Sequence, residues 1–268
     1  MTSRQRNSRP HVLAFAAETG TRAGRGKDNL VHNLTLPPQA EALIESGKWV
    51  VKVSHQAKGA EEKRDWSAPP TAAAISGTLY KRNKYDILKH FLGANIPDSL
   101  FLVSTVEDQG RVRPAEITLQ QKVPDFTLDK LTPNQKKNPL LHTNMLQLLT
   151  KLQYMYSVVG EANSRTSQAA TLDTKLDLGQ VSSFVRGESL DHQFDLKDSK
   201  KAVSKISSPN LLVDPETFNL YCIDFDQGDW GPGMDEAKEL VFEIDDRRLQ
   251  KATTAAHLAL QGHVERPM

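Results

Sequence analysis

The order of the predicted elements indicates an α+β fold. Strands and one helix come first along the chain, helices dominate the second half, and a predicted β-hairpin lies between the helical parts. Segregated elements of this kind are typical of α+β domains, whereas a strictly alternating order would favour a parallel α/β sheet. With 268 residues the chain is long enough to bury a sizeable core in one or two domains.

Composition and charge exclude several classes of protein. The chain has 38% hydrophobic residues, and its 34 Lys+Arg against 33 Asp+Glu leave a net charge of +1, which gives no support for a nucleic-acid or membrane-surface partner. A single cysteine, Cys222, excludes an internal disulfide framework, and no 18-residue apolar run predicts a transmembrane helix. The apolar stretch at 12–17 is too short for a signal-peptide core, so we expect a cytoplasmic protein.

The first half of the chain is predicted to hold a leader followed by a β-rich region. Residues 1–30 are basic and rich in Gly and Arg, which predicts a weakly ordered, solvated leader. Apolar and β-branched residues predict a strand at 48–53, and helical spacing of apolar residues predicts a helix at 80–92. Two strands, at 99–104 and 116–123, are expected to form an antiparallel pair.

The second half is predicted to be mainly helical. Apolar residues recur every three or four positions over 139–159, which indicates a long helix with one buried face. The polar residues 161–200 are interpreted as an irregular insertion. Strands at 211–213 and 219–225 are expected to form a hairpin, whose turn begins with Asp and Pro as a type I turn does. An amphipathic helix is predicted at 246–262.

Lys52 is the first candidate functional residue. It lies between β-branched residues in the predicted strand at 48–53, whereas an exposed edge lysine more often has polar neighbours. The alternative is an ordinary edge-strand lysine on the solvent face.

Asn210 and Asp224 are the next candidates, because they flank the predicted hairpin. Folding of the hairpin would bring both side chains to the same end of it. An amide oxygen and a carboxylate that converge there suit Mg²⁺, with phosphate oxygens completing its ligands. The alternative is that both are turn-forming residues at the ends of a hairpin.

The segment NLLVDPETFNLYCIDF, residues 210–225, resembles the catalytic-loop-to-metal-loop segment of the protein-kinase-like superfamily. It is especially similar to the aminoglycoside-phosphotransferase-like and atypical bacterial branches. The resemblance extends over residues 31–245 in the order of the elements. It implies a two-lobed fold, with a small β-rich N-lobe at 31–123 and a reduced helical C-lobe at 124–268, which includes the insertion.

The resemblance also implies a role for each matched residue. Asn210 and Asp224 match the two Mg²⁺ ligands, and Lys52 matches the strand lysine that contacts the nucleotide phosphates. The helix at 80–92 takes the place of the helix that gives this lysine a carboxylate partner. The remaining nucleotide-binding candidates are Asp86 as that partner and Gln121, Lys122 and Val123 as the adenine-contacting hinge. The implied ligands are ATP and Mg²⁺, and the implied reaction transfers the γ-phosphoryl group to a small-molecule or protein acceptor that the sequence does not identify.

The sequence departs from the family pattern around the phosphate site. Lys205 occupies the place of the family's catalytic Asp, and a charged lysine cannot accept a proton. No Gly-rich phosphate loop precedes Lys52, and only Gly47 lies nearby. Asp86 is shorter than the family's Glu, for which Glu61 and Glu62 are alternatives.

Two further departures lie at the end of the chain. The metal loop reads Asp224-Phe225-Asp226 instead of Asp-Phe-Gly, and the residues after it are too few for the large helical subdomain of typical protein kinases. A pseudokinase that binds a nucleotide or a partner without turnover is therefore an alternative to an active phosphotransferase. An unrelated α+β binding protein is the third hypothesis.

Overall fold

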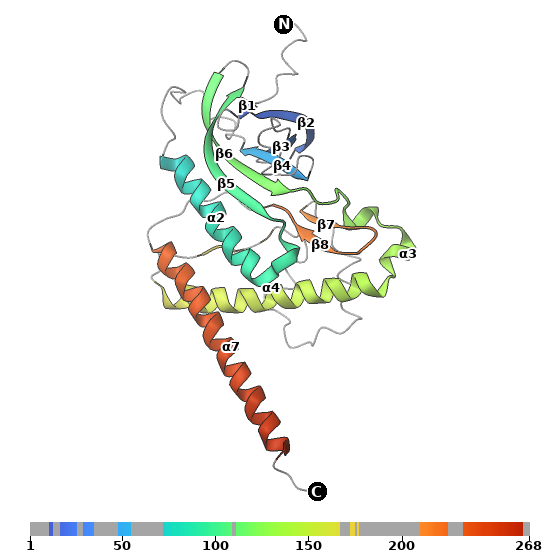
Figure 1. Cartoon of the computed structure of the whole chain (residues 1–268), viewed down its shortest axis with the longest axis vertical. Coiled ribbons are helices and arrows are strands. Elements are labelled where there is room, and N and C mark those ends of the chain that lie inside the picture. The colour runs from blue at the N-terminus through green and yellow to red at the C-terminus, as the bar shows by residue number, and fades with distance from the viewer. Residues whose placement is uncertain are drawn as a thin grey trace.

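The computed structural model describes residues 11–12, 17–25, 29–34, 48–54, 72–108, 111–166, 172–174, 176, 210–224 and 233–264. Within these ranges the strands form two antiparallel sheets, which are a closed barrel and a two-stranded hairpin. Figure 1 shows the barrel toward the N-terminal end of the molecule and the long helices α4 and α7 on the opposite side. The predicted α+β class is confirmed, because the strands are antiparallel and the helices are grouped beside them.

The barrel closes in the order β1-β2-β3-β4-β6-β5. Its strands are β1 (His11–Val12), β2 (Ala17–Arg25), β3 (Asn29–Leu34), β4 (Trp49–Ser54), β5 (Ser99–Asp108) and β6 (Arg111–Gln121). Closure occurs through β1, which pairs with β2 on one side and with β5 on the other. A closed barrel leaves no long unpaired strand edge.

The first 30 residues contain barrel strands where a leader was predicted. β1, β2 and the first two residues of β3 lie in this range, and β2 pairs with β3 in a register that shifts twice between Thr19 and Gly24. Composition misled the prediction, because strand formation depends strongly on the neighbouring strands that a sequence finds in the fold. The predicted polar, basic leader is therefore wrong for the residues of β1 and β2.

Side chains along β4 and β6 alternate between two faces. Val51 lies on one face, and Lys52 lies on the other, opposite Thr118 of β6. The helix α2 (Ala72–Leu92) packs against β5 and β6, and its Lys81 bonds Glu116, two residues from Thr118. α2 therefore covers the face of the barrel that carries Lys52.

α4 (Pro139–Arg165) is the central helix of the remaining part. It begins after Asn138, whose side chain accepts a hydrogen bond from Leu140 N at 2.9 Å, with a proline in the first helical turn. Its apolar face is buried, as the spacing predicted. The buried apolar residues of α4 are Leu141, Met145, Leu148, Leu149, Leu152, Met155, Val158, Val159 and Ala162. Two short helical turns, η4 (Leu128–Lys130) and α3 (Pro133–Lys136), lie between β6 and α4, and η3 (Gly93–Asn95) lies between α2 and β5. Most of the predicted insertion at 161–200 lies outside the described residues.

β7 (Leu211–Val213) and β8 (Leu220–Cys222) form the predicted hairpin. Its connection is closed by a hydrogen bond from Phe218 N to Asp214 O at 2.8 Å. Phe218 has a φ of 58°, in the left-handed region that non-glycine residues rarely adopt. Its buried ring, together with a hydrogen bond from Asn144 of α4 to its carbonyl, holds it in this conformation.

α7 (Met234–Val264) begins well before the predicted helix at 246–262 and packs on α4 through its first half. Its buried Asp245 carboxylate accepts a hydrogen bond from Tyr154 of α4 at 2.6 Å and lies 2.8 Å from His90 Nε2 of α2. Three helices therefore meet at one side chain. Figure 1 shows the second half of α7 extending away from the other elements. None of the helices in the described ranges is long and apolar enough to cross a bilayer.

Candidate functional site

Lys52 lies in the interior of the barrel sheet and reaches the hairpin. β4 pairs with β3 on one side and β6 on the other, and the Lys52 side chain is buried. The alternative of a solvent-facing edge lysine is therefore wrong. The Nζ atom donates a hydrogen bond to the carbonyl oxygen of Ile223, which follows β8. This contact gives a polar partner to a cation that would be costly to bury alone.

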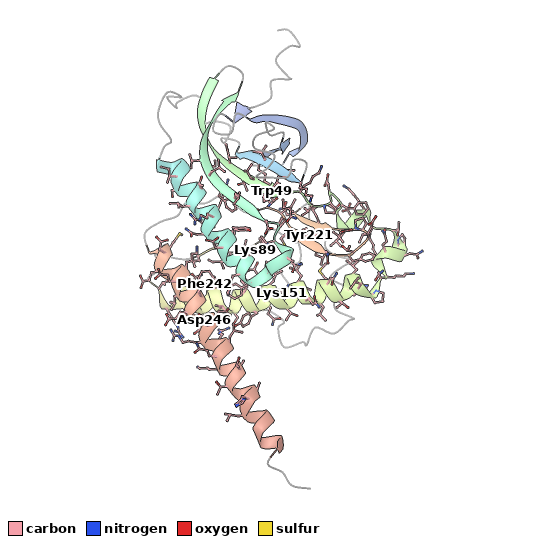
Figure 2. The ribbon with its side chains drawn as sticks, in the orientation of Figure 1. Trp49, Lys89, Lys151, Tyr221, Phe242 and Asp246 are labelled. Atoms are coloured by element: carbon pink, nitrogen blue, oxygen red, sulfur yellow. The ribbon has the colours of Figure 1, made fainter. Side chains whose placement is uncertain are left out.

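Asn210 and Asp224 lie at the same end of the hairpin, as its predicted pairing requires. Ile223 N donates a hydrogen bond to Asn210 O at 3.1 Å, so the residue before Asp224 is held against Asn210. Lys52 bonds the carbonyl oxygen of the same Ile223. The structure thus gathers three predicted site residues around Ile223. In Figure 2, Trp49 on β4 and Tyr221 on β8 mark the two elements that this contact joins.

Charged groups act on Lys52 from two directions. Burial lowers the pKa of Lys52 from its ordinary value of 10.5 to about 8; the Asp224 carboxylate opposes this shift, and the Lys81 ammonium group adds to it. The Lys52 ammonium group is therefore under the influence of both an anion just after the hairpin and a cation of α2. A further anion bound here would favour the protonated form of Lys52.

α2 presents a lysine, and not the predicted carboxylate, to this face of the barrel. Lys81 Nζ lies 2.7 Å from Glu116 Oε2, while Asp86 Oδ2 lies 2.6 Å from Lys238 Nζ of α7. The predicted pairing of Asp86 with Lys52 is therefore wrong. Five residues along a helix rotate a side chain by about 140°, so Asp86 projects from a different side of α2 than Lys81 does.

The sequence contains a signal for the buried lysines of α2. Lys81 and Lys84 share a helical stripe with Leu88 and Leu92, and all four side chains are buried. A lysine at a position of the apolar stripe indicates a charge that will be buried. Lys81 was missed because only the carboxylates of this helix were considered as partners of Lys52.

The three residues predicted to contact adenine lie at the end of β6 and directly after it. Gln121 N donates a hydrogen bond to Asp98 O at 2.7 Å, and Lys122 N donates one to Lys48 O at 2.6 Å. Both amides are therefore used in backbone pairing next to the sheet. Val123 follows these two residues and is partly exposed. Recognition of a base through a backbone amide of this segment would thus fall to Val123.

Glycines lie two strands away from Lys52 in the same row of the sheet. Gly24 of β2 is opposite Val31 of β3, and Val31 is opposite Lys52. β2 also contains Gly20. Glycine allows a close approach of the backbone to a ligand, because it has no Cβ atom. These glycines were missed because residues 1–30 were predicted to be a leader, although their spacing was visible in the sequence.

The chemistry of Asn210 and Asp224 fits a magnesium ion that arrives with a phosphate. Mg²⁺ is commonly held by one or two protein oxygen ligands while substrate phosphates and water complete its octahedron. In the described ranges, no group of three or more His, Cys, Asp or Glu side chains is placed to hold a metal by itself. Lys205, Asp226, Glu61 and Glu62, which also entered the prediction, lie outside the described residues.

No known protein-family model matches the chain, and no curated protein is significantly similar to it in sequence.

Proposed function

We propose that the chain is a kinase-like phosphotransferase that binds Mg–ATP between the barrel, acting as an N-lobe, and the helical part, acting as a C-lobe. The observation that carries this proposal is the hydrogen bond from Lys52 to Ile223, whose residues are 171 positions apart. It brings a buried strand lysine next to Asp224 and Asn210. Phosphoryl transfer depends mainly on positioning and on neutralisation of phosphate charge, and these residue types serve both purposes.

The order of the elements supports the proposal. The resemblance implies a lysine strand, a helix, two strands, a long helix and a hairpin flanked by Asn and Asp. β4, α2, β5, β6, α4 and β7–β8 follow one another in this order. Within the barrel, the order β2-β3-β4-β6-β5 gives β4 a strand neighbour on each side, with α2 over the face that bears Lys52. If the resemblance of the segment 210–225 were a coincidence, the order of the other elements would not be expected to match the order that the resemblance implies.

In this proposal each residue has a defined task. Lys52 binds a phosphate oxygen and exchanges its hydrogen bond to Ile223 for one to the ligand. Asp224 and Asn210 hold Mg²⁺, which neutralises the phosphate chain and orients its terminal group. Val123 contacts the base, and Gly24, in the row of the sheet that contains Lys52, allows the backbone of β2 to approach the ligand.

A pseudokinase is the second candidate, and Lys205 favours it. The family's catalytic Asp has no counterpart at that position, and a general base contributes a factor of about 10²–10⁴ to catalysis. Its loss would slow phosphoryl transfer without removing the contribution of positioning and charge neutralisation. We therefore expect slow turnover if the protein is an enzyme, and binding without turnover if it is a pseudokinase.

Thermal melting with and without Mg–ATP tests the binding proposal. A ligand that binds only the native state raises the melting temperature, so the wild type should melt higher with Mg–ATP. Asp224→Asn should lose this shift, whereas Asp246→Asn, at an exposed position of α7 labelled in Figure 2, should keep it. Equal shifts in Asp224→Asn and the wild type would show that Asp224 is only the end of a hairpin.

Turnover of ATP labelled in its γ-phosphoryl group, followed as labelled acceptor or as free phosphate, separates the two candidates. Turnover that disappears in Asp224→Asn supports the phosphotransferase. Nucleotide binding with no turnover above that of Asp224→Asn, in the presence of candidate small-molecule and protein acceptors, supports the pseudokinase.

A further inference from the structure

A second lysine stands on the face of the barrel that carries Lys52. Thr118 of β6 is opposite Lys52, and Glu116, two residues before Thr118, lies on the same face. Lys81 of α2 bonds Glu116 at 2.7 Å, and the two side chains are only 6% and 22% exposed. The register of the sheet and this ion pair therefore place Lys81 beside the row that contains Lys52.

The close approach of α2 to β6 fixes this arrangement. A Cβ atom at Gly77, one turn before Lys81, would lie 2.5 Å from Glu116 Oε1, so the carboxylate lies directly over the backbone of α2. The Lys81 ammonium group also lowers the pKa of Lys52, which is a repulsion between neighbouring positive charges. Glu116 thus holds the Lys81 cation on the face of the barrel that also carries Lys52.

We infer that Lys81 is a second cation for the phosphate chain of the ligand, held by Glu116 beside Lys52, so that the site selects ligands with at least two anionic groups. The inference rests on the proposed function and names the feature of the ligand that the site selects. Two like charges that face one buried region repel each other, and a polyanion placed between them replaces repulsion by two attractions. A carboxylate on α2, as first predicted for Asp86, would have the opposite effect.

The inference predicts how affinity depends on the number of phosphates. Adenosine offers no anion to either lysine, AMP offers a single phosphate, and ADP and ATP can meet both cations. Charge-assisted hydrogen bonds are the strong ones, so the loss of one cation should cost the di- and triphosphate about tenfold or more in affinity. Adenosine should lose nothing.

Four variants separate an anion-binding role from a merely structural ion pair. Lys81→Met removes the charge, and Lys81→Arg retains it. The double variant Lys81→Glu with Glu116→Lys restores an ion pair in reversed orientation. Lys89→Met is the matched control. Lys89 lies near the C-terminal end of α2 and is also ion-paired, with its Nζ 2.7 Å from Asp98 Oδ1.

Isothermal titration calorimetry of each variant with adenosine, AMP, ADP and ATP, in the presence of Mg²⁺, gives the dissociation constants. Inorganic tripolyphosphate is titrated as a probe that needs no base recognition. Melting curves without ligand show which variants are folded. We expect Lys81→Met and the reversed pair to bind ATP and tripolyphosphate about tenfold or more weakly with adenosine unchanged, and Lys81→Arg and Lys89→Met to resemble the wild type.

Wild-type affinity for ATP in Lys81→Met or in the reversed pair would overturn the inference, because it would show that binding does not need a cation at position 81 of α2. An equal loss of adenosine and ATP binding in Lys81→Met would do the same. If Lys81→Met does not fold, the reversed pair and Lys81→Arg still decide the question.

The outcomes also separate this inference from the proposed function. A wild type that binds ATP with no dependence on Lys81 keeps the proposed function and removes the inference. If the wild type binds tripolyphosphate through Lys81 and binds no nucleotide more tightly than tripolyphosphate, the proposed nucleotide binding is wrong and the polyanion site stands. A wild type that binds neither overturns both.

Discussion

The Lys52 ammonium group and the Ile223 carbonyl oxygen form a hydrogen bond that joins the barrel to the hairpin. Because Ile223 N also bonds the backbone oxygen of Asn210, Lys52 and the two ends of the hairpin meet at this one residue. The geometry places the chemistry-bearing residues at a junction of two sheets, where neither sheet alone could assemble them.

Lys52→Met should stabilise the ligand-free protein at neutral pH while abolishing binding of Mg–ATP. In the folded state the pKa of Lys52 is lowered to about 8 from 10.5, so between these values the unfolded chain binds more protons and wild-type stability rises with pH. Below pH 8 Lys52 is charged in both states, so the full cost of burying its ammonium group lowers the stability of the wild type. Lys52→Met removes this cost but also loses the hydrogen bond to Ile223, which offsets part of the gain. We expect a net gain of about 1–2 kcal/mol in the free energy of unfolding at pH 7.

Urea denaturation of the wild type and Lys52→Met at several pH values checks this. The advantage of the variant should shrink as the pH rises from 8 to 10.5. Parallel stability curves over that interval would contradict the lowered pKa of Lys52.

Asp245→Asn should loosen the contact among α2, α4 and α7. Burial raises the pKa of Tyr154 to about 12, and its hydrogen bond to the Asp245 carboxylate contributes to the rise. Neutralising Asp245 removes that contribution, so the pKa of Tyr154 should fall toward, but not reach, its ordinary value of 10.0. Alkaline titration of tyrosinate absorbance, with Tyr154→Phe to identify the signal, measures this shift.

The same variant should lose about 1–3 kcal/mol of stability, because a buried carboxylate with two polar contacts is replaced by a neutral amide. Asp246→Asn, the neighbouring exposed position, is the control and should change stability by less than about 0.5 kcal/mol. Similar effects of the two substitutions would argue against a special role of Asp245.

His142→Leu should stabilise the protein. His142 of α4 is buried, and in the described part of the structure both of its ring nitrogens lack a hydrogen-bond partner. Burying a polar group without a partner costs about 1–3 kcal/mol, and a leucine of similar size removes that cost. A rise of about 1–2 kcal/mol in the free energy of unfolding is expected from urea denaturation. A loss of stability, or a loss of Mg–ATP binding in a variant that still folds, would show that the imidazole makes a contact that the leucine does not replace.

Cys222 should be unreactive in the native protein. It is buried in β8, and burial raises the pKa of its thiol to about 12, so the reactive thiolate is scarce at pH 8. Ellman's reagent should therefore react only as fast as the protein unfolds, and at once in concentrated urea. Rapid reaction of the folded protein would mean that β8 opens readily, which would also release Asp224 from its place beside Asn210.

Several features were determined locally and could be predicted. The apolar residues of α4 recur at the helical period, so its buried face followed from spacing alone. The hairpin followed from the turn residues between two short apolar runs. Because antiparallel pairing brings both ends of a hairpin together, the proximity of Asn210 and Asp224 followed as well.

Other features depended on the partner that each element finds. β2 was missed because its Gly- and Arg-rich sequence has little strand propensity of its own, and its strand is defined by pairing with β1 and β3. Asp86 was assigned to Lys52 from its helix alone, but the rotation of α2 turns it toward Lys238, on a helix that begins about 150 positions later in the sequence. Residue type and local periodicity thus determined the helices, the hairpin and the candidate residues. The tertiary structure decided which of them meet, because packing sets the rotation of each helix and the neighbours of each strand, and it brought Lys81 instead of Asp86 to the face that carries Lys52.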